Sequence, residues 1–332
     1  MSRFLSLLSR AGLNGFFFLM IAMVLLAWLF PEAGADDNPF HLKTISNIGV
    51  GIIFFFYGLK LNWTRLKTGL GHWKLHLVIQ ITTFLVFPLL ILMLYSFTSN
   101  PDYEYWWIGV FYLAALPSTV SSSVVMVSIA GGNISAAIFN ASVSSLIGIF
   151  ITPVWMSLFV DSDTLSIADL SGVIINLCLQ VLLPVIAGLM LNNVLGGFVE
   201  RYKAHLRYFD QAVILLIVFR AFAESFTGNM FTGYTALELV TLTALMLLLF
   251  MVMLLIMQVI STWMKFPRED RITVIFCGSK KSLVQGAVMG QILFPQANAF
   301  GIILLPLMIY HSLQLLAGSM LAQQMAGKAK TS

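Results

Sequence analysis

Charged residues are scarce in this chain. Only 10% of its 332 residues are Asp, Glu, Lys or Arg, whereas soluble domains carry about 25%. Hydrophobic residues make up 59%, and the mean hydropathy is +0.92. These values exclude an ordinary soluble domain and predict a membrane protein surrounded by the lipid bilayer. The pI near 9.1 comes from basic residues between the apolar segments, so it does not indicate a nucleic acid partner.

Cysteines and acidic residues, which could form disulfides or bind metal ions, are also rare within the apolar segments. Cys178 and Cys277 both lie in apolar segments, so the sequence implies no disulfide framework. Apart from acids at segment edges, Glu224 is the only acid within an apolar segment. Methionines such as Met246 and Met253 fit apolar packing rather than metal binding. We therefore expect no cofactor and no metal site.

Long apolar runs dominate what remains. A transmembrane helix needs about 20 mostly apolar residues, and the chain has room for about ten such helices. The predicted fold class is an all-α polytopic membrane protein with ten transmembrane helices. The segments lie at about 14–30, 42–60, 72–96, 106–130, 133–158, 169–194, 208–226, 236–264, 271–293 and 297–321.

The first segment could instead be a secretory signal peptide. Pro31-Glu32-Ala33-Gly34-Ala35 could form a cleavage site. The apolar run before it, from Phe16 to Phe30, is long for a signal peptide. Removing it would also break the symmetry of two halves, so we retain this segment as a span.

The distribution of basic residues predicts the orientation, because short cytoplasmic loops carry an excess of Lys and Arg. With both termini in the cytoplasm, Lys43 is the only one of the 18 basic residues in an outer loop, and Arg220, Lys280 and Lys281 lie within spans. We expect a multi-pass protein of the bacterial inner membrane type. The predicted cytoplasmic basic residues are Arg3, Arg10, Lys60, Arg65, Lys67, Lys74, Arg201, Lys203, Arg207, Lys265, Arg268, Arg271, Lys328 and Lys330.

The segments divide into two halves, residues 1–160 and 161–332. Each half has an odd number of spans, so the second is inverted relative to the first. The fourth segment of each half is interrupted, by Pro117 and a serine run in one and by Gly278 and a Ser/Lys cluster in the other. Such paired interruptions are typical of the midplane site of a secondary transporter. We expect serines to cap the half-helices that follow and the two breaks to cross.

Lys280 and Lys281 lie deep in the ninth segment. Arg271 marks its cytoplasmic edge, and Lys280 follows roughly 13 Å further on at ~1.5 Å per helical residue. That depth is near the middle of a hydrocarbon core about 30 Å thick, where a charge marks a pathway, a partner or a water-filled cavity. The alternative is a shallow segment from which both lysines extend to the cytosol.

Short motifs link the chain to a known family. They are Gly71-His72-Trp73-Lys74-Leu75-His76, Leu116-Pro117-Ser118-Thr119-Val120, Ala130-Gly131-Gly132-Asn133, Phe276-Cys277-Gly278-Ser279-Lys280-Lys281-Ser282-Leu283 and Leu305-Pro306-Leu307-Met308-Ile309-Tyr310-His311. On these motifs the chain resembles the bile acid:sodium symporter family over nearly its whole length, and within it the divergent sodium/bile acid cotransporter-seven-like branch. The motif that contains Lys280, residues 276–283, is the most specific of the five.

The resemblance implies an architecture and a mode of action. It implies a panel domain from spans 1, 2, 6 and 7 and a core domain from spans 3–5 and 8–10. The unwound parts of spans 4 and 9 would cross in the core. Substrate would bind between core and panel, and alternating access would move one against the other.

The chain departs from the sodium sites that the resemblance implies. Phe276 stands where a carboxylate ligand is expected, and Lys280 and Lys281 replace a glutamine and an asparagine. Ala137 and Ala141 replace hydroxyl ligands, and Thr83 replaces a further glutamine. Because sodium needs oxygen ligands, we expect these sites to be lost.

A lysine ammonium could supply the missing charge, and we expect Lys280 in particular to occupy the vacated cation position. If it also exchanged a proton, protons would replace sodium as the coupling ion. His311 could instead be a packed hydrogen-bonding residue. The predicted substrate and ion site consists of Thr83, Ser118, Thr119, Ser121, Ser122, Ser123, Ser279, Lys280, Lys281, Ser282, Gln285 and His311.

Arg220 and Glu224 are possible charge partners of this site. Their i,i+4 spacing allows them to pair on one helix face. Alternatively, Glu224 could contact a lysine across the domain boundary.

These observations predict a secondary active transporter of a small organic anion, because two lysines and two half-helix N-termini would meet at one place. One alternative is a symporter coupled to sodium or protons through rearranged sites. Another is a membrane regulatory protein that transports nothing. A Ser/Lys hydrolase is disfavoured because adjacent helical residues do not face each other.

Overall fold

The computed structural model describes residues 15–34, 41–60, 72–98, 100–160, 170–294 and 298–328. The termini at 1–14 and 329–332, on which the predicted orientation partly rests, and Ala35 of the possible cleavage site lie outside these ranges. Within them the chain forms helices and connecting turns, without strands. The elements are α2 (Gly15–Leu29), η1 (Pro31–Gly34), α3 (Leu42–Lys60), α5 (Trp73–Ile81), η3 (Thr82–Val86), α6 (Phe87–Thr98), η4 (Pro101–Tyr103), α7 (Glu104–Ala115), α8 (Ser121–Ala130), α9 (Ile134–Phe159), α10 (Leu170–Leu177), η5 (Cys178–Leu182), α11 (Leu183–Met190), α12 (Asn192–Thr227), α13 (Ala236–Trp263), α14 (Arg268–Gly278), α15 (Leu283–Leu293) and α16 (Phe300–Lys328).

The long apolar helices make this a multi-pass membrane protein. Five uninterrupted stretches are long and apolar enough to cross a bilayer: Leu42–Lys60, Trp73–Thr98, Ile134–Phe159, Ala236–Trp263 and Phe300–Ala326. A sixth results if Ile175–Met190 and Asn192–Val199, bent by 96°, are taken together. The helices α7, α8, α14 and α15, of 10 to 12 residues each, are individually too short to span.

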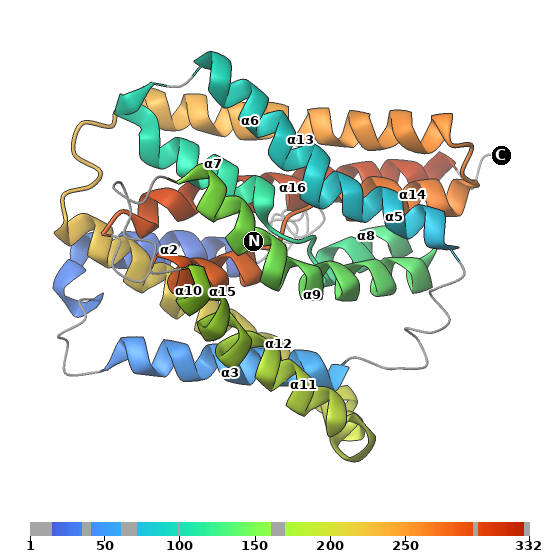
Figure 1. The fold of residues 1–332 in the computed structure, drawn as a ribbon, viewed down its shortest axis with the longest axis horizontal. Helices are drawn as coiled ribbons and strands as arrows, with labels where there is room; N and C mark the ends of the chain where they lie inside the picture. The colour runs from blue at the N-terminus through green and yellow to red at the C-terminus, as the bar shows by residue number, and fades with distance from the viewer. Residues whose placement is uncertain are drawn as a thin grey trace, which may run out of the picture.

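The helices pack in two neighbourhoods that meet in the middle of the molecule. In one, α3 contacts α11 and α12, and α2 contacts α12. In the other, α16 contacts α7, α8, α13 and α15, while α14 contacts α5, α8, α9 and α13. Figure 1 shows α3 and α13 on opposite sides of the molecule, with α16 between them. Contacts of α12 with α15 and α16 join the two neighbourhoods.

Both expected helix breaks are present. The first helix ends at Ala115, Leu116 is extended (φ −71°, ψ 153°), and α8 begins at Ser121. The second ends at Gly278, and α15 begins at Leu283. The capping prediction is correct for α15, where the Ser282 hydroxyl accepts from the Gln285 amide. It is wrong for α8, whose N-cap is Val120, a residue without a side-chain acceptor.

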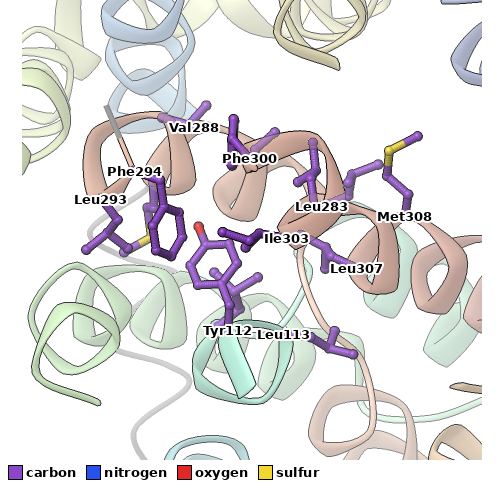
Figure 2. Close-up of a cluster of buried hydrophobic side chains, with 14 of the residues drawn as sticks. Tyr112, Leu113, Leu283, Val288, Leu293, Phe294, Phe300, Ile303, Leu307 and Met308 are labelled. Atoms are coloured by element: carbon purple, nitrogen blue, oxygen red, sulfur yellow. The ribbon is translucent and has the colours of Figure 1, made fainter. Parts of the chain in front are cut away.

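The pieces around the breaks are fixed by close packing. Figure 2 shows Tyr112 of α7 surrounded by Phe294, Phe300 and Ile303, with its hydroxyl directed toward the C-terminal helices. That hydroxyl donates to the carbonyl oxygen of Gly286 over 2.6 Å. At Gly278 a Cβ atom would lie 2.1 Å from the Met257 sulfur, so any other residue there would require the Met257 side chain to move.

Candidate functional site

The two breaks contact each other directly and form what we call the junction, residues 114–123 and 275–282. The Ser282 amide donates to the carbonyl oxygen of Pro117 over 3.0 Å. In the opposite direction, the Ser118 hydroxyl donates to the carbonyl oxygen of Cys277 over 2.6 Å. Each break therefore supplies donors to the backbone of the other.

Exposed carbonyl groups explain why the junction needs these donors. The last four carbonyls of a helix have no partner within the helix, and buried carbonyls left unpaired are costly. At the end of α14, the carbonyl oxygen of Phe276 accepts from the Ser123 hydroxyl over 3.2 Å. At the end of α7, the carbonyl oxygen of Ala115 accepts from the Thr152 hydroxyl over 2.8 Å. The carbonyls on either side of it, those of Ala114 and Leu116, have a different partner.

That partner is the ammonium group of Lys281. Its Nζ atom lies 2.6 Å from the carbonyl oxygen of Ala114 and 2.7 Å from that of Leu116. A third carbonyl, that of Thr83, lies 2.8 Å away. The side chain is fully buried, and its Nζ lies 4.4 Å from the ring centroid of Phe87. A protonated lysine has three N–H donors, so these three carbonyls use all of them.

The Thr83 carbonyl is available because of Pro88. Residues 82–86 form a wide turn in which the Phe87 amide bonds to the Thr82 carbonyl, five residues back. The matching donor for Thr83 would be residue 88, and proline has no N–H. The next carbonyl, that of Phe84, accepts from the Trp155 indole over 2.8 Å. Pro88 thus frees one of the three carbonyls that hold Lys281.

Lys280 has weaker surroundings than its neighbour. Its Nζ donates to the carbonyl oxygen of Ser122 over 3.2 Å and contacts the sulfur of Met126. It also lies 5.3 Å from the ring centroid of Phe276. We expected Lys280 to occupy the vacated cation position, but Lys281 has the larger carbonyl set. Both side chains are fully buried and do not extend to the surface.

A layer from α16, which sequence analysis largely missed, fixes the backbone of Lys281. Gln314 donates through Nε2 to the Lys281 carbonyl (2.8 Å) and accepts through Oε1 from its amide (2.9 Å). The Nδ1 atom of His311 accepts from the same Nε2 over 2.8 Å, which agrees with the packed hydrogen-bonding alternative for His311. Tyr310 donates to the Ser279 carbonyl over 2.6 Å. The sequence pattern that could have identified these residues is a stripe of polar side chains, at positions 310, 311 and 314, on an otherwise apolar helix.

The remaining predicted residues lie in the junction or, for Thr83 and Gln285, in neighbouring helices, and their contacts differ. Ser279 bonds within its own helix to the Ile275 carbonyl (2.7 Å), and Ser122 donates to the Thr119 hydroxyl (3.3 Å). Ser121 begins α8. Within the described residues, the Thr83 hydroxyl and the Gln285 side-chain oxygen are buried without a hydrogen-bond partner.

The described residues show no cation site formed by acids. They contain no group of three or more His, Cys, Asp or Glu residues suited to a metal ion. Phe276, Ala137 and Ala141, which replace the expected sodium ligands, are fully buried. No ion pair joins Lys280 or Lys281 to an acid in the part of the chain that the structure describes.

Arg220 and Glu224 lie apart from the junction. Arg220 Nη2 donates to Glu224 Oε1 over 2.8 Å, so the predicted pairing on one face of α12 is confirmed. Both residues line a cavity of about 150 Å³ together with Lys43 and Gln291, and neither Lys280 nor Lys281 lines it. The predicted charged residues therefore lie in two separate places: Lys280 and Lys281 at the junction, and Arg220 and Glu224 at this cavity.

Comparisons with known proteins agree with the resemblance. The model of the SBF-like CPA transporter family (DUF4137) matches residues 14–327. The chain is 39% identical over 315 residues to "Uncharacterized protein PA2026" of Pseudomonas aeruginosa, covering 94% of this chain and 93% of that protein. It is 35% identical over 317 residues to "Putative symporter YfeH" of Escherichia coli (94% and 92%). It is 31% identical over 319 residues to "Sodium/bile acid cotransporter 7" of Rattus norvegicus (95% and 93%).

Proposed function

From the premise that this chain belongs to the SBF-like CPA transporter family, we propose that it is a secondary active transporter of a small organic anion. It works by alternating access, and the ammonium of Lys281 replaces a bound cation at the junction. The predicted family resemblance is confirmed by the match over residues 14–327. The substrate class, the loss of sodium and the mode of access are our proposal.

We place ten transmembrane helices in this protein, arranged as inverted repeats at 1–160 and 161–332 with both termini inside, in the inner membrane. The short pieces α7 and α8 together form the fourth span, and α14 and α15 form the ninth. The hydrogen bond between Ser282 and Pro117 supports their crossing. The contacts of α2, α3, α11 and α12 support a panel unit, and those of α16 with α7, α8, α13 and α15 support a core unit.

The observation that carries this proposal is the set of three carbonyls around Lys281 Nζ, at 2.6, 2.7 and 2.8 Å. Carbonyl oxygens at the end of a helix attract cations because they form the negative end of the helix dipole. An ammonium bonded to all three leaves no free carbonyl there for a sodium ion. A side chain of the protein, Lys281, thus supplies the positive charge that a sodium ion would bring, and sodium coupling through the junction is lost.

A positive junction favours anions over cations as substrate. Lys281, bonded to three carbonyls, supplies a buried ammonium group, Lys280 supplies a second buried amine, and no described acid is paired with either. A cationic substrate would be repelled from such a region at the short distances and low polarity of a protein interior. We propose protons as the coupling ion, because a buried lysine can bind and release a proton.

The name of the rat relative favours a second candidate, a sodium-coupled symporter. "Sodium/bile acid cotransporter 7" of Rattus norvegicus aligns over 95% of this chain. Such a carrier would need sodium ligands elsewhere than the junction. Its prediction is uptake driven by a sodium gradient.

Reconstitution distinguishes these candidates. Purified protein in liposomes should take up labelled small organic anions with equal rates under inward sodium and choline gradients. Lys281→Met should lower both uptake and stability, because it removes the donor from three carbonyls. Uptake that requires sodium would favour the second candidate, and the absence of uptake for every anion tested would contradict a transport function.

A further inference from the structure

A groove on the surface of the molecule lies between α13, α14 and α16. Its volume is about 500 Å³, and its lining residues are apolar except for Gln258 and Gln324. All three helices belong to the same helix neighbourhood. The groove is therefore separate from the cavity beside Arg220, whose lining comes from both neighbourhoods.

The groove faces the apolar part of the membrane. Of the five long apolar stretches, α13 is the least covered by the rest of the chain, with 28% buried against 39% or more in the others. Two of the lining side chains, Leu255 and Met320, are 62% and 56% exposed. A gap beside such side chains forfeits dispersion contacts unless another molecule fills it. In a bilayer, acyl chains are the molecules at hand.

The groove runs toward one end of the molecule. Its lining residues recur at helical spacing, at 251, 254, 255 and 258 on α13 and at 317, 320, 321, 324 and 325 on α16. Both sets approach the C-terminal ends of their helices, at Trp263 and Lys328, and α14 begins nearby at Arg268. Figure 1 shows α14 and these two helix ends on the same side of the molecule, near the C-terminus. In the proposed topology this side is cytoplasmic.

Arg268 places a positive charge at this end of the groove. Its Nη2 atom donates to the carbonyl oxygen of Met325, a lining residue, over 3.0 Å and to that of Ala130 over 3.4 Å. Both bonds come from one of the three guanidinium nitrogens, and the side chain is exposed. In the part of the chain that the structure describes, no acid forms an ion pair with Arg268. Its Nη1 and Nε donors can therefore bind an anion at the mouth of the groove.

Two further basic residues lie beside Arg268. Lys265 is exposed in the turn between α13 and α14. Arg271 is partly exposed and lies about one helical turn before Ile275, which lines the groove. Neither residue forms an ion pair with an acid among the described residues.

The acids at this end do not cancel the positive charge. Asp270 is buried, and its two carboxylate oxygens bond to His72 (3.1 Å) and Asn133 (2.9 Å). Glu269 is exposed. Three basic side chains therefore meet one exposed carboxylate, and basic clusters at a membrane surface attract anionic lipids.

We propose that this groove binds an anionic phospholipid, with an acyl chain along α13 and α16 and the phosphate at Arg268. Guanidinium groups suit this task because they bind phosphate oxygens through paired donors. The ligand is a lipid rather than a soluble phosphate, because the apolar groove leads directly to the basic residues. The bound lipid would connect the turn between α13 and α14 to the end of α16. This inference goes beyond the proposed function and does not depend on transport.

The test measures lipid binding by the purified full-length protein in detergent. Phosphatidylglycerol is the probe, and phosphatidylcholine with the same acyl chains is the comparison. Native mass spectrometry counts bound lipids, and thermal unfolding measures the stabilisation that a ligand of the native state produces. Each variant is measured with and without lipid, because Arg268 also donates to two carbonyls and its loss lowers stability by itself.

Two variants change the site and two are matched controls. Met320→Trp fills the groove, and Met93→Trp introduces the same side chain at a similarly exposed methionine of α6 (53% against 56%). Arg268→Gln removes the charge at the mouth of the groove, and Arg207→Gln does so at an exposed arginine of α12. Lys265→Met tests the same charge cluster at a side chain that holds no carbonyl, and it decides the question if Arg268→Gln does not fold.

We expect phosphatidylglycerol to stay bound and to raise the melting temperature more than phosphatidylcholine does. Loss of a charge-assisted hydrogen bond should raise the Kd of phosphatidylglycerol about tenfold in Arg268→Gln. Lys265→Met should weaken binding in the same direction, Met320→Trp should weaken binding of both lipids, and both controls should bind as the wild type does.

Three results would overturn the inference. The first is equal binding of the two lipids, which would leave no role for the basic residues. The second is binding of phosphatidylglycerol by the groove and charge variants as tight as that by the controls. The third is a wild-type dimer that Met320→Trp dissociates and lipid does not, which would assign the groove to a second copy of this chain.

Discussion

The ammonium nitrogen of Lys281 lies 2.7 Å from the carbonyl oxygen of Leu116, a residue on the other broken helix. This bond joins a cation to backbone that Pro117 prevents from continuing as helix. Two further carbonyls complete its surroundings, so the lysine satisfies three acceptors that the break exposes. Irregular backbone at membrane depth is tolerated only where such partners exist. Lys281 therefore stabilises the helix break by donating to its carbonyls, in addition to placing a positive charge there.

The first prediction compares the two lysines by the same substitution. Lys281→Met leaves three buried carbonyls without donors, at about 1–3 kcal/mol each, so we expect a loss of unfolding free energy on the order of 3 kcal/mol or more. Lys280→Met removes one of two donors from the carbonyl of Ser122, which lies in the first turn of α8 and has the Met126 amide as its helical donor, and should cost only about 1 kcal/mol. Thermal unfolding in detergent measures both. The account is contradicted if Lys280→Met is the more harmful variant.

The second prediction concerns Gln314. Gln314→Leu removes both hydrogen bonds to the backbone of Lys281 and one to His311, while its volume stays similar. We expect lower thermal stability, because a buried amide and a buried carbonyl lose their partners. Gln324→Leu, at an exposed position of the same helix, is the control and should have little effect. Equal stability of the two variants would show that the layer from α16 does not support the junction.

Cysteine reactivity provides the third prediction. Cys277 is fully buried in the junction, whereas Cys178 is partly exposed. A small, membrane-permeant thiol reagent such as N-ethylmaleimide should modify Cys178 faster than Cys277 in the folded protein, and it should reach Cys277 only after unfolding. Mass spectrometry of the wild type and of Cys178→Ser reads each site separately. Rapid modification of Cys277 in the native protein would mean that the junction opens to solvent.

Much of this arrangement was predictable from sequence. Pro117, Gly278 and the serine runs interrupt otherwise apolar helices, so both breaks could be located to within a few residues. The i,i+4 spacing was enough to predict the pair of Arg220 and Glu224.

Long-range contacts were not predictable in the same way. Which lysine reaches the carbonyls depends on how the chain turns after Gly278, and neighbouring residues there point in different directions. Gln314 and Thr152 act through contacts with residues far away in sequence, and no local pattern indicates their partners. The cavity beside Arg220 has the same origin, because its lining comes from six separate elements.

The most direct test of the account is the sodium dependence of thermal stability. A ligand that binds only the native state must raise the melting temperature. Because Lys281 already occupies the three junction carbonyls, the wild-type protein should melt at the same temperature in sodium chloride and in choline chloride of equal ionic strength. A saturable rise that is specific to sodium would contradict the claim that an ammonium group has replaced the cation.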